Sequence, residues 1–107
     1  MTLNELQNES VKLEPEYLTR GEEALLGLMG LNSASGKCLE LYRKTLFEGD
    51  AMTSEMLLEA LGEVICYVAI TAHSSDIELD KVMRTATEVV RVKLEKKDSD
   101  AGDKKES

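Results

Sequence analysis

The most apolar part of the chain is the run LLEALGEVICYVAI, residues 57–70. Four residues interrupt it: Glu59, Gly62, Glu63 and Tyr67. A helix formed by this run would be apolar on almost every side, and such a helix is normally buried all round. Because a chain of 107 residues offers few other helices to cover it, we predict a central helix, from about Glu55 to Ala72, whose burial is completed by a second copy of the chain.

Two capping boxes predict the helices before the central one. In this motif a Ser or Thr oxygen accepts a hydrogen bond from a free helix N–H, and a Glu three residues later reaches back. The segment Thr2–Glu5 has this spacing and predicts a short helix that ends at about residue 12. Thr19–Glu22 repeats the spacing and predicts a long helix over about 22–48. Gly49 can then take the positive φ that ends a helix.

A third spacing of this kind, Ser75–Glu78, follows a predicted turn at 73–76 and predicts a last helix over about 78–94. The apolar residues of that helix recur with a 3.6-residue period. Residues 96–107 have mixed charges and no apolar side chain larger than that of alanine, which is typical of disorder. The pattern therefore predicts an all-α four-helix bundle in residues 1–95 and a disordered charged tail in 96–107.

Three glycines, Gly27, Gly30 and Gly36, lie inside the predicted long helix. Each costs about 1 kcal/mol relative to alanine in a helix interior. Such a cost persists where another backbone or a ligand must come close. A kink or break around residues 31–35 would explain the glycines equally well, so the sequence leaves both interpretations open.

Composition narrows the classes of function. The formal net charge of -8 argues against binding to nucleic-acid phosphates. The central run is too short and too interrupted by glutamate to suggest a membrane span, and the N-terminal MTLNELQNES does not have the pattern of a signal peptide. Cys38 and Cys66 lack metal-ligand spacing and are expected to be buried thiols of a reducing compartment. We therefore expect a cytoplasmic protein with no nucleic-acid or membrane partner.

The glutamates of the central helix give the first indication of a functional site. A buried carboxylate needs a cation, a hydrogen-bond partner or a proton. Glu59 and Glu63 therefore indicate either a metal site or the remnant of one.

Three segments together resemble the MazG-like family of all-α nucleoside triphosphate pyrophosphohydrolases, in its small single-domain form. LNELQ, residues 3–7, is similar to the first helix of that family, and GLNSASGKCLELYRKTLFEG, residues 30–49, to the second. LLEALGEVICY, residues 57–67, is similar to the third. The resemblance covers about residues 2–94 and implies a MazG-like four-helix fold, which we expect to complete its core as a homodimer or a dimer of dimers.

In that family, four carboxylates in E-x-x-E and E-x-x-D patterns hold magnesium for hydrolysis between the α- and β-phosphates. Residues three apart share a helix face, and Mg²⁺ prefers hard oxygen ligands. The corresponding positions here are Ala34, Lys37, Ala60 and Glu63, so only Glu63 keeps a carboxylate. The resemblance thus implies a degenerate metal site with no resident cofactor, in which Lys37 would face Glu63 and pair with it.

Two readings of this site stay open. In one, Glu40, Glu59 and Glu63 form a shifted cluster that binds magnesium and supports weak or altered pyrophosphohydrolase activity. In the other, which we favour, the protein is a non-catalytic regulator that binds a nucleotide or a partner protein. The residues expected to bind a ligand are Lys37, Arg43, Lys44, Glu63 and Tyr67. Because small MazG-like proteins are frequent in bacteriophage genomes, the resemblance also suggests a phage-encoded protein.

Overall fold

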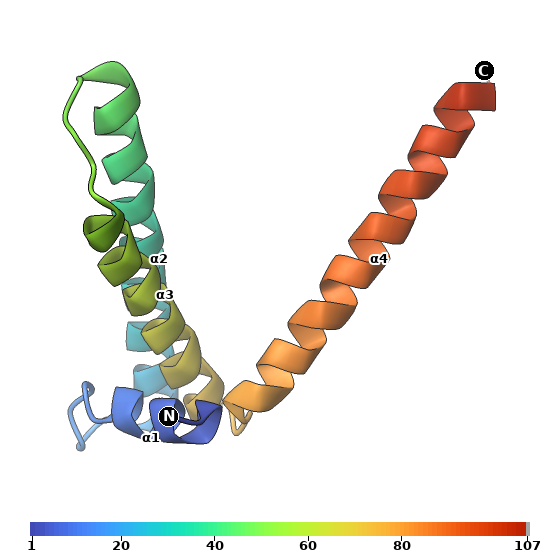
Figure 1. The fold of residues 1–107 in the computed structure, drawn as a ribbon. Coiled ribbons are helices and arrows are strands. Elements are labelled where there is room, and N and C mark those ends of the chain that lie inside the picture. Colours follow the sequence, from blue (N-terminus) through green and yellow to red (C-terminus); the bar gives the residue numbers. More distant parts are fainter. Residues whose placement is uncertain (107) are drawn as a thin grey trace.

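The computed structural model describes residues 1–106, with side chains described to Gly102. Within this part the chain is all-α and has four helices, which confirms the predicted fold class (Figure 1). The helices are α1, Leu3–Val11; α2, Arg20–Phe47; α3, Ser54–Ser74; and α4, Leu79–Glu106.

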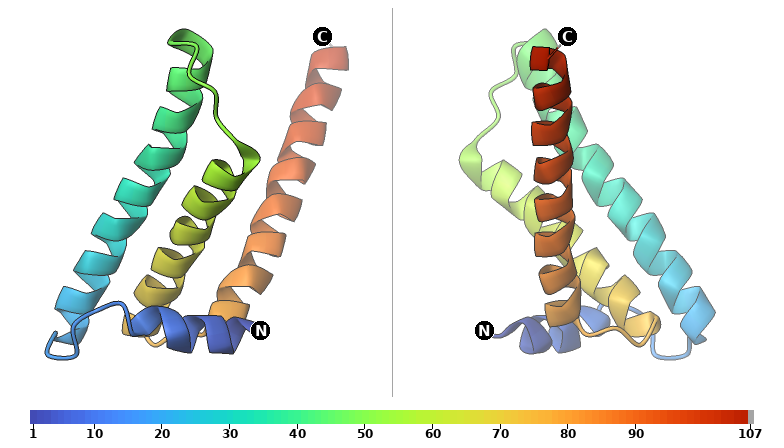
Figure 2. Two further views of the ribbon diagram at one scale, coloured as in Figure 1. Left: turned by 60° about the vertical axis from the view of Figure 1, so that its left-hand side comes forward. Right: turned by 90° about the vertical axis from the view of Figure 1, so that its right-hand side faces the viewer.

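The helices form an open V rather than a closed bundle. α2 and α3 pack as an antiparallel hairpin, α1 crosses the base of that hairpin, and α4 projects away from it (Figures 1 and 2). α2 and α4 do not pack on each other anywhere in the described chain. The radius of gyration is 17.8 Å, against about 13 Å for a compact chain of this length. The four-helix bundle predicted from the sequence is therefore not closed within one copy of the chain.

The helix starts follow the predicted local chemistry. The side chains of Thr2, Thr19 and Thr53 each accept a hydrogen bond from the N–H three residues later, and at Thr19 both halves of the capping box are present. α2 then continues unbroken through residues 31–35, so the break that the sequence left open does not occur. Gly49, with φ of 74°, takes the predicted left-handed conformation after α2.

Two of the three α2 glycines are required by the packing of α3. A Cβ on Gly27 would lie 2.6 Å from Thr71 Oγ1 and 3.3 Å from the Thr71 backbone nitrogen. A Cβ on Gly30 would overlap the ring of Tyr67. Gly36, in contrast, has nothing within 4 Å of that position. Close approach of the two helices thus explains Gly27 and Gly30 but not Gly36.

The turn between α3 and α4 differs from the prediction. α3 includes His73 and ends at Ser74, so Ser75 is its C-cap instead of the N-cap of a third capping box. Asp76 takes a positive φ of 58°, which Asp tolerates better than most residues. The N–H of Ile77 bonds back to Ala72 O at 2.8 Å, and this bond closes a Schellman turn.

The far half of α4 also differs from the prediction. The helix continues to Glu106, whereas the sequence predicts a disordered tail from residue 96. Lys, Glu and Ala are good helix formers, and pairing at i+3 and i+4 adds support on a helix surface. Arg91 makes such pairs with Glu88 and Glu95. Local propensity and charge pairing therefore hold a helix that packs on no other element along this length.

The core of one copy is small. Its buried apolar residues are Ala34, Ala60, Ala69, Ile70, Ala72 and Leu79. The larger apolar side chains that the sequence assigns to the core are mostly exposed, including Leu58, Leu61 and Ile65 of α3. The predicted all-round burial of the central helix is therefore not achieved within a single chain.

α3 is long and apolar enough to cross a membrane by length and composition alone, and the core helix of a soluble protein can pass the same test.

Candidate functional site

An open pocket lies between α2 and α3 at the place where the sequence predicts the remnant of a metal site. Its volume is about 430 Å³. Lys37 and Leu41 of α2 line one side, and residues of α3 line the other. The α3 residues are Met56, Glu59, Ala60 and Glu63. The pocket thus has an apolar floor and a charged rim of one lysine and two glutamates.

Lys37 and Glu63 form an ion pair across the pocket. Lys37 Nζ lies 2.7 Å from Glu63 Oε2, which confirms the predicted pairing. The pair is half-exposed, with 56% of the Lys37 side chain and 45% of the Glu63 side chain accessible. The hydrogen bond and the charge of Glu63 raise the pKa of Lys37. An ammonium group therefore occupies the position next to the only carboxylate that matches a family ligand.

Ala34 and Ala60, where the resemblance would place two further metal ligands, are packed between the two helices. Ala34 is 3% exposed and Ala60 is 2% exposed. Both methyl groups belong to the small core between α2 and α3. Ala34 does not line the pocket, so a carboxylate there would be buried in the helix contact, whereas Ala60 also forms part of the pocket lining.

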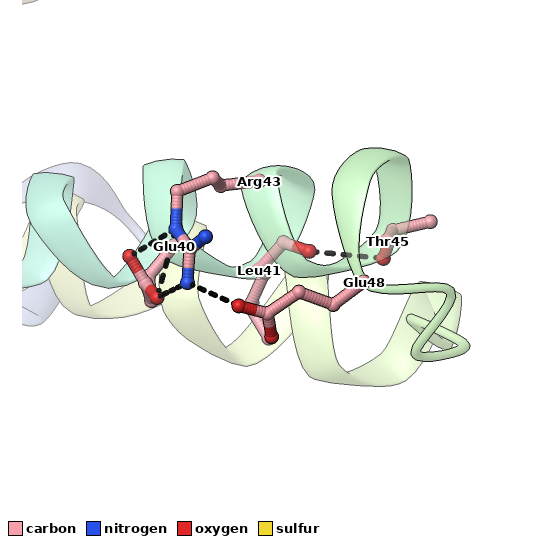
Figure 3. Close-up of polar contacts among 5 residues, drawn as sticks. All are labelled: Glu40, Leu41, Arg43, Thr45 and Glu48. Atoms are coloured by element: carbon pink, nitrogen blue, oxygen red, sulfur yellow. Dashed lines mark hydrogen bonds and ion pairs between the residues drawn. The ribbon is translucent and has the colours of Figure 1, made fainter.

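Glu40 is not among the residues that line the pocket, and it is bound by Arg43 of the same helix (Figure 3). Arg43 donates from Nε and Nη2 to the Glu40 carboxylate, and its Nη2 also donates to Glu48 at 3.0 Å. The bonds from Arg43 lower the pKa of Glu40. The structure therefore does not bring Glu40 together with Glu59 and Glu63, and it leaves Arg43 bound between two carboxylates.

The last two residues predicted to bind a ligand also lie outside the pocket. Lys44 lines an adjoining pocket of about 190 Å³, which shares Leu41 and Met56 with the first pocket. Tyr67 is half-buried, with its ring against the backbone of Gly30. Of the five predicted ligand-binding residues, the structure thus brings only Lys37 and Glu63 into one site.

A metal site would need several converging ligands. Within the described residues, no three His, Cys, Asp or Glu side chains are grouped so that they could hold a metal ion. Glu59 and Glu63 share the pocket rim, but the third charged group there is the ammonium of Lys37. The donor set therefore does not fit magnesium, because Mg²⁺ requires oxygen ligands and a cation beside them repels it.

No family model, curated protein or solved structure matches this chain. The resemblance to MazG-like proteins therefore remains a prediction from the segments quoted above.

Gln7 is a structurally decisive residue that the sequence reasoning missed. Its side chain is buried and donates to Ala69 O at 3.2 Å and to Ile77 O at 2.9 Å. Its Oε1 accepts from the N–H of Leu79 at 3.1 Å, so a residue of α1 caps the start of α4. The sequence feature that could have indicated this role is the position of Gln7, a polar residue directly after Leu6 on the inward face of the first helix.

Proposed function

We propose that this chain is a non-catalytic, cytoplasmic regulator, built on a MazG-like helical scaffold, that binds a partner protein. The observation that carries the proposal is the ion pair of Lys37 and Glu63 at the remnant site. It leaves no carboxylate pair free to hold the metal that phosphate hydrolysis would require. The buried alanines Ala34 and Ala60 support the same reading.

The charges around the pocket favour a protein over a nucleotide. A nucleoside triphosphate needs cations to balance its phosphates. Lys37 is paired with Glu63, and Arg43 is bound by Glu40 and Glu48. A phosphate bound to Lys37 in this pocket would therefore have to displace Glu63 and lie near Glu59. Because a phosphate would compete with these carboxylates for the cations, we favour a partner protein over a nucleotide as the ligand.

The same pocket suits a basic side chain of a partner. Glu59 lines the rim and makes no ion pair within the described chain. The floor of Leu41, Met56 and Ala60 could cover the aliphatic stem of a Lys or Arg, whose charged end would reach Glu59. The net charge of -8 would also steer a basic partner surface towards this protein.

A first experiment tests the absence of catalysis. Pyrophosphate release from canonical and modified nucleoside triphosphates is measured with Mg²⁺ and with Mn²⁺, and nucleotide binding is measured by calorimetry. We expect no turnover and no binding. Metal-dependent release that Glu63→Gln abolishes would overturn the proposal in favour of the weak pyrophosphohydrolase. Restoring the family ligands is a poor control, because Ala34→Glu would force a carboxylate into a buried contact.

A second experiment tests protein binding. The wild type and Glu59→Lys are used in parallel to capture partners from cells that naturally express the protein, and the affinity is then measured with the purified partner. Glu16→Lys, in the exposed segment before α2, is the matched control with the same change of charge. We expect Glu59→Lys to weaken binding at least tenfold and Glu16→Lys to leave it within twofold. Equal effects of both variants would count against the pocket.

A further inference from the structure

The pocket between α2 and α3 continues into the adjoining pocket at the loop end of the hairpin. The two pockets share Leu41 and Met56 as part of their walls. The other residues of the adjoining pocket belong to the last turn of α2 and the loop to α3, and they are Lys44, Thr45, Asp50, Ala51 and Met52. The two pockets together form one groove, with the Glu59 pocket and the Met52 pocket as its two ends.

The two ends of the groove differ in charge. In the Glu59 pocket, Lys37 is neutralised by Glu63, and Glu59 makes no ion pair within the described chain. In the Met52 pocket, Lys44 and Asp50 both line the wall and have opposite charges. A basic side chain there would meet Lys44, and an acidic one would meet Asp50. The Glu59 pocket therefore favours a cation, and the Met52 pocket favours an uncharged side chain.

The wall of the Met52 pocket suits an apolar side chain. Met52 is half-buried in the loop, and Met56 at the start of α3 is 45% exposed. Methionine side chains are flexible and adapt to the shape of the group that they contact. The volume of about 190 Å³ equals that of roughly six water molecules. The pocket therefore has room for one apolar side chain of medium size.

The loop beside the Met52 pocket is fixed at both ends (Figure 1). The N–H of Asp50 donates to Lys44 O at 3.3 Å, and the Thr53 hydroxyl accepts from the N–H of Met56 at 3.1 Å. Between these bonds, the N–H groups of Ala51 and Met52 have no acceptor within the described chain. An extended peptide that lies along the loop can accept hydrogen bonds from them. Because the loop is already fixed, it loses little freedom when a ligand binds.

We propose that the groove binds an extended segment of the partner protein in which a Lys or Arg and an apolar residue lie two positions apart. The basic side chain reaches Glu59, and the apolar side chain enters the Met52 pocket. In an extended chain, residues two apart point to the same side and lie about 7 Å from each other, whereas adjacent residues point to opposite sides. This spacing suits two pockets that share a wall. The inference rests on the proposed function, because it specifies the partner of the same site.

The test titrates the full chain with synthetic peptides and follows the amide chemical shifts by NMR. The first peptide, Gly-Ser-Arg-Ser-Leu-Ser-Gly, has its arginine and leucine two positions apart. The second, Gly-Ser-Ser-Arg-Leu-Ser-Gly, has the same composition but places the arginine and leucine next to each other. We expect the first peptide to bind at least fivefold more tightly than the second and to shift the amide signals of Ala51, Met52 and Glu59.

Two variants assign the two ends of the groove. Glu59→Gln should weaken binding of the first peptide at least fivefold. Glu55→Gln is the matched control, because Glu55 is exposed one turn earlier in α3 and lines neither pocket, and it should change the affinity less than twofold. Met52→Ala removes part of the apolar wall and should lower the preference for the first peptide over the second at least twofold. The amide spectra show whether each variant is folded.

The possible outcomes separate this inference from the proposed function. Equal affinity for the two peptides, with a loss in Glu59→Gln, would overturn the role of the Met52 pocket and leave the basic site at Glu59 intact. If neither peptide binds at millimolar concentration while Glu59→Lys still weakens binding of the natural partner, the extended segment is wrong and the proposed function stands. Equal effects of Glu59→Gln and Glu55→Gln would count against both.

Discussion

Replacing Gly27 by alanine probes the contact on which the α2–α3 hairpin depends. The new Cβ would lie 2.6 Å from Thr71 Oγ1, 3.3 Å from Ile70 Cγ2 and 3.3 Å from the Thr71 backbone nitrogen. Ile70 is fully buried, and Thr71 Oγ1 is bonded to Tyr67 O at 2.8 Å. The backbone contact cannot be relieved by a change of rotamer, so the two helices must move apart.

The expected change in the free energy of unfolding is the sum of two destabilising contributions and one stabilising contribution. Overpacking in a core costs about 1–3 kcal/mol, and loss of the Thr71 hydrogen bond adds about 1 kcal/mol. The higher helix propensity of alanine stabilises the fold by about 1 kcal/mol relative to glycine. We therefore expect Gly27→Ala to lower the free energy of unfolding by about 2 kcal/mol, which lowers the Tm by roughly 8 °C for a chain of this length.

Gly36→Ala is the matched control in the same helix. Nothing lies within 4 Å of its Cβ position, so only the propensity gain applies and we expect a stabilisation of about 0.5–1 kcal/mol. Both variants are measured by thermal and urea unfolding at one protein concentration, because association would make the Tm concentration-dependent. In the double variant Gly27→Ala/Thr71→Ala, part of the loss should be recovered. If Gly27→Ala stabilises as much as Gly36→Ala, the close contact of α2 and α3 is refuted.

Three further predictions concern polar contacts. Gln7→Met should lower the free energy of unfolding by about 3 kcal/mol in urea titrations, because it leaves buried backbone groups of the α3–α4 turn without partners, while Asn8→Ala on the exposed side of α1 should have little effect. Glu40→Gln should cost its full loss of stability above the ordinary glutamate pKa of 4.5 and progressively less below it. Since the pKa of Glu40 is lowered in the fold, its contribution is lost as the pH falls through that lowered pKa, and stability curves of the two proteins should converge there. Lys37→Met should destabilise less than Gly27→Ala, because water screens the half-exposed pair. Its difference from the wild type should disappear as the pH rises above 10.5 through the raised pKa of Lys37.

Local chemistry made much of the fold predictable. The capping threonines, the glycine after α2 and the four helical segments all depend on contacts within a few residues of sequence. The pairing of Lys37 with Glu63 was predicted from the resemblance, which places both residues opposite each other on neighbouring helices. The Ser75 capping box was wrong, although its spacing is the same as at Thr19. The N–H of Leu79 finds its acceptor in Gln7 instead, more than seventy residues away in sequence.

The sequence by itself determined that this chain is all-α and where most helices begin. Those properties depend on helix periodicity, capping and residue identity, which are local. Only the tertiary structure decided which glycines the hairpin requires, that Glu40 is held by Arg43, and that α4 departs from the hairpin at an open angle. These depend on hydrogen bonds and steric contacts between segments far apart in the chain, and no local pattern encodes such contacts.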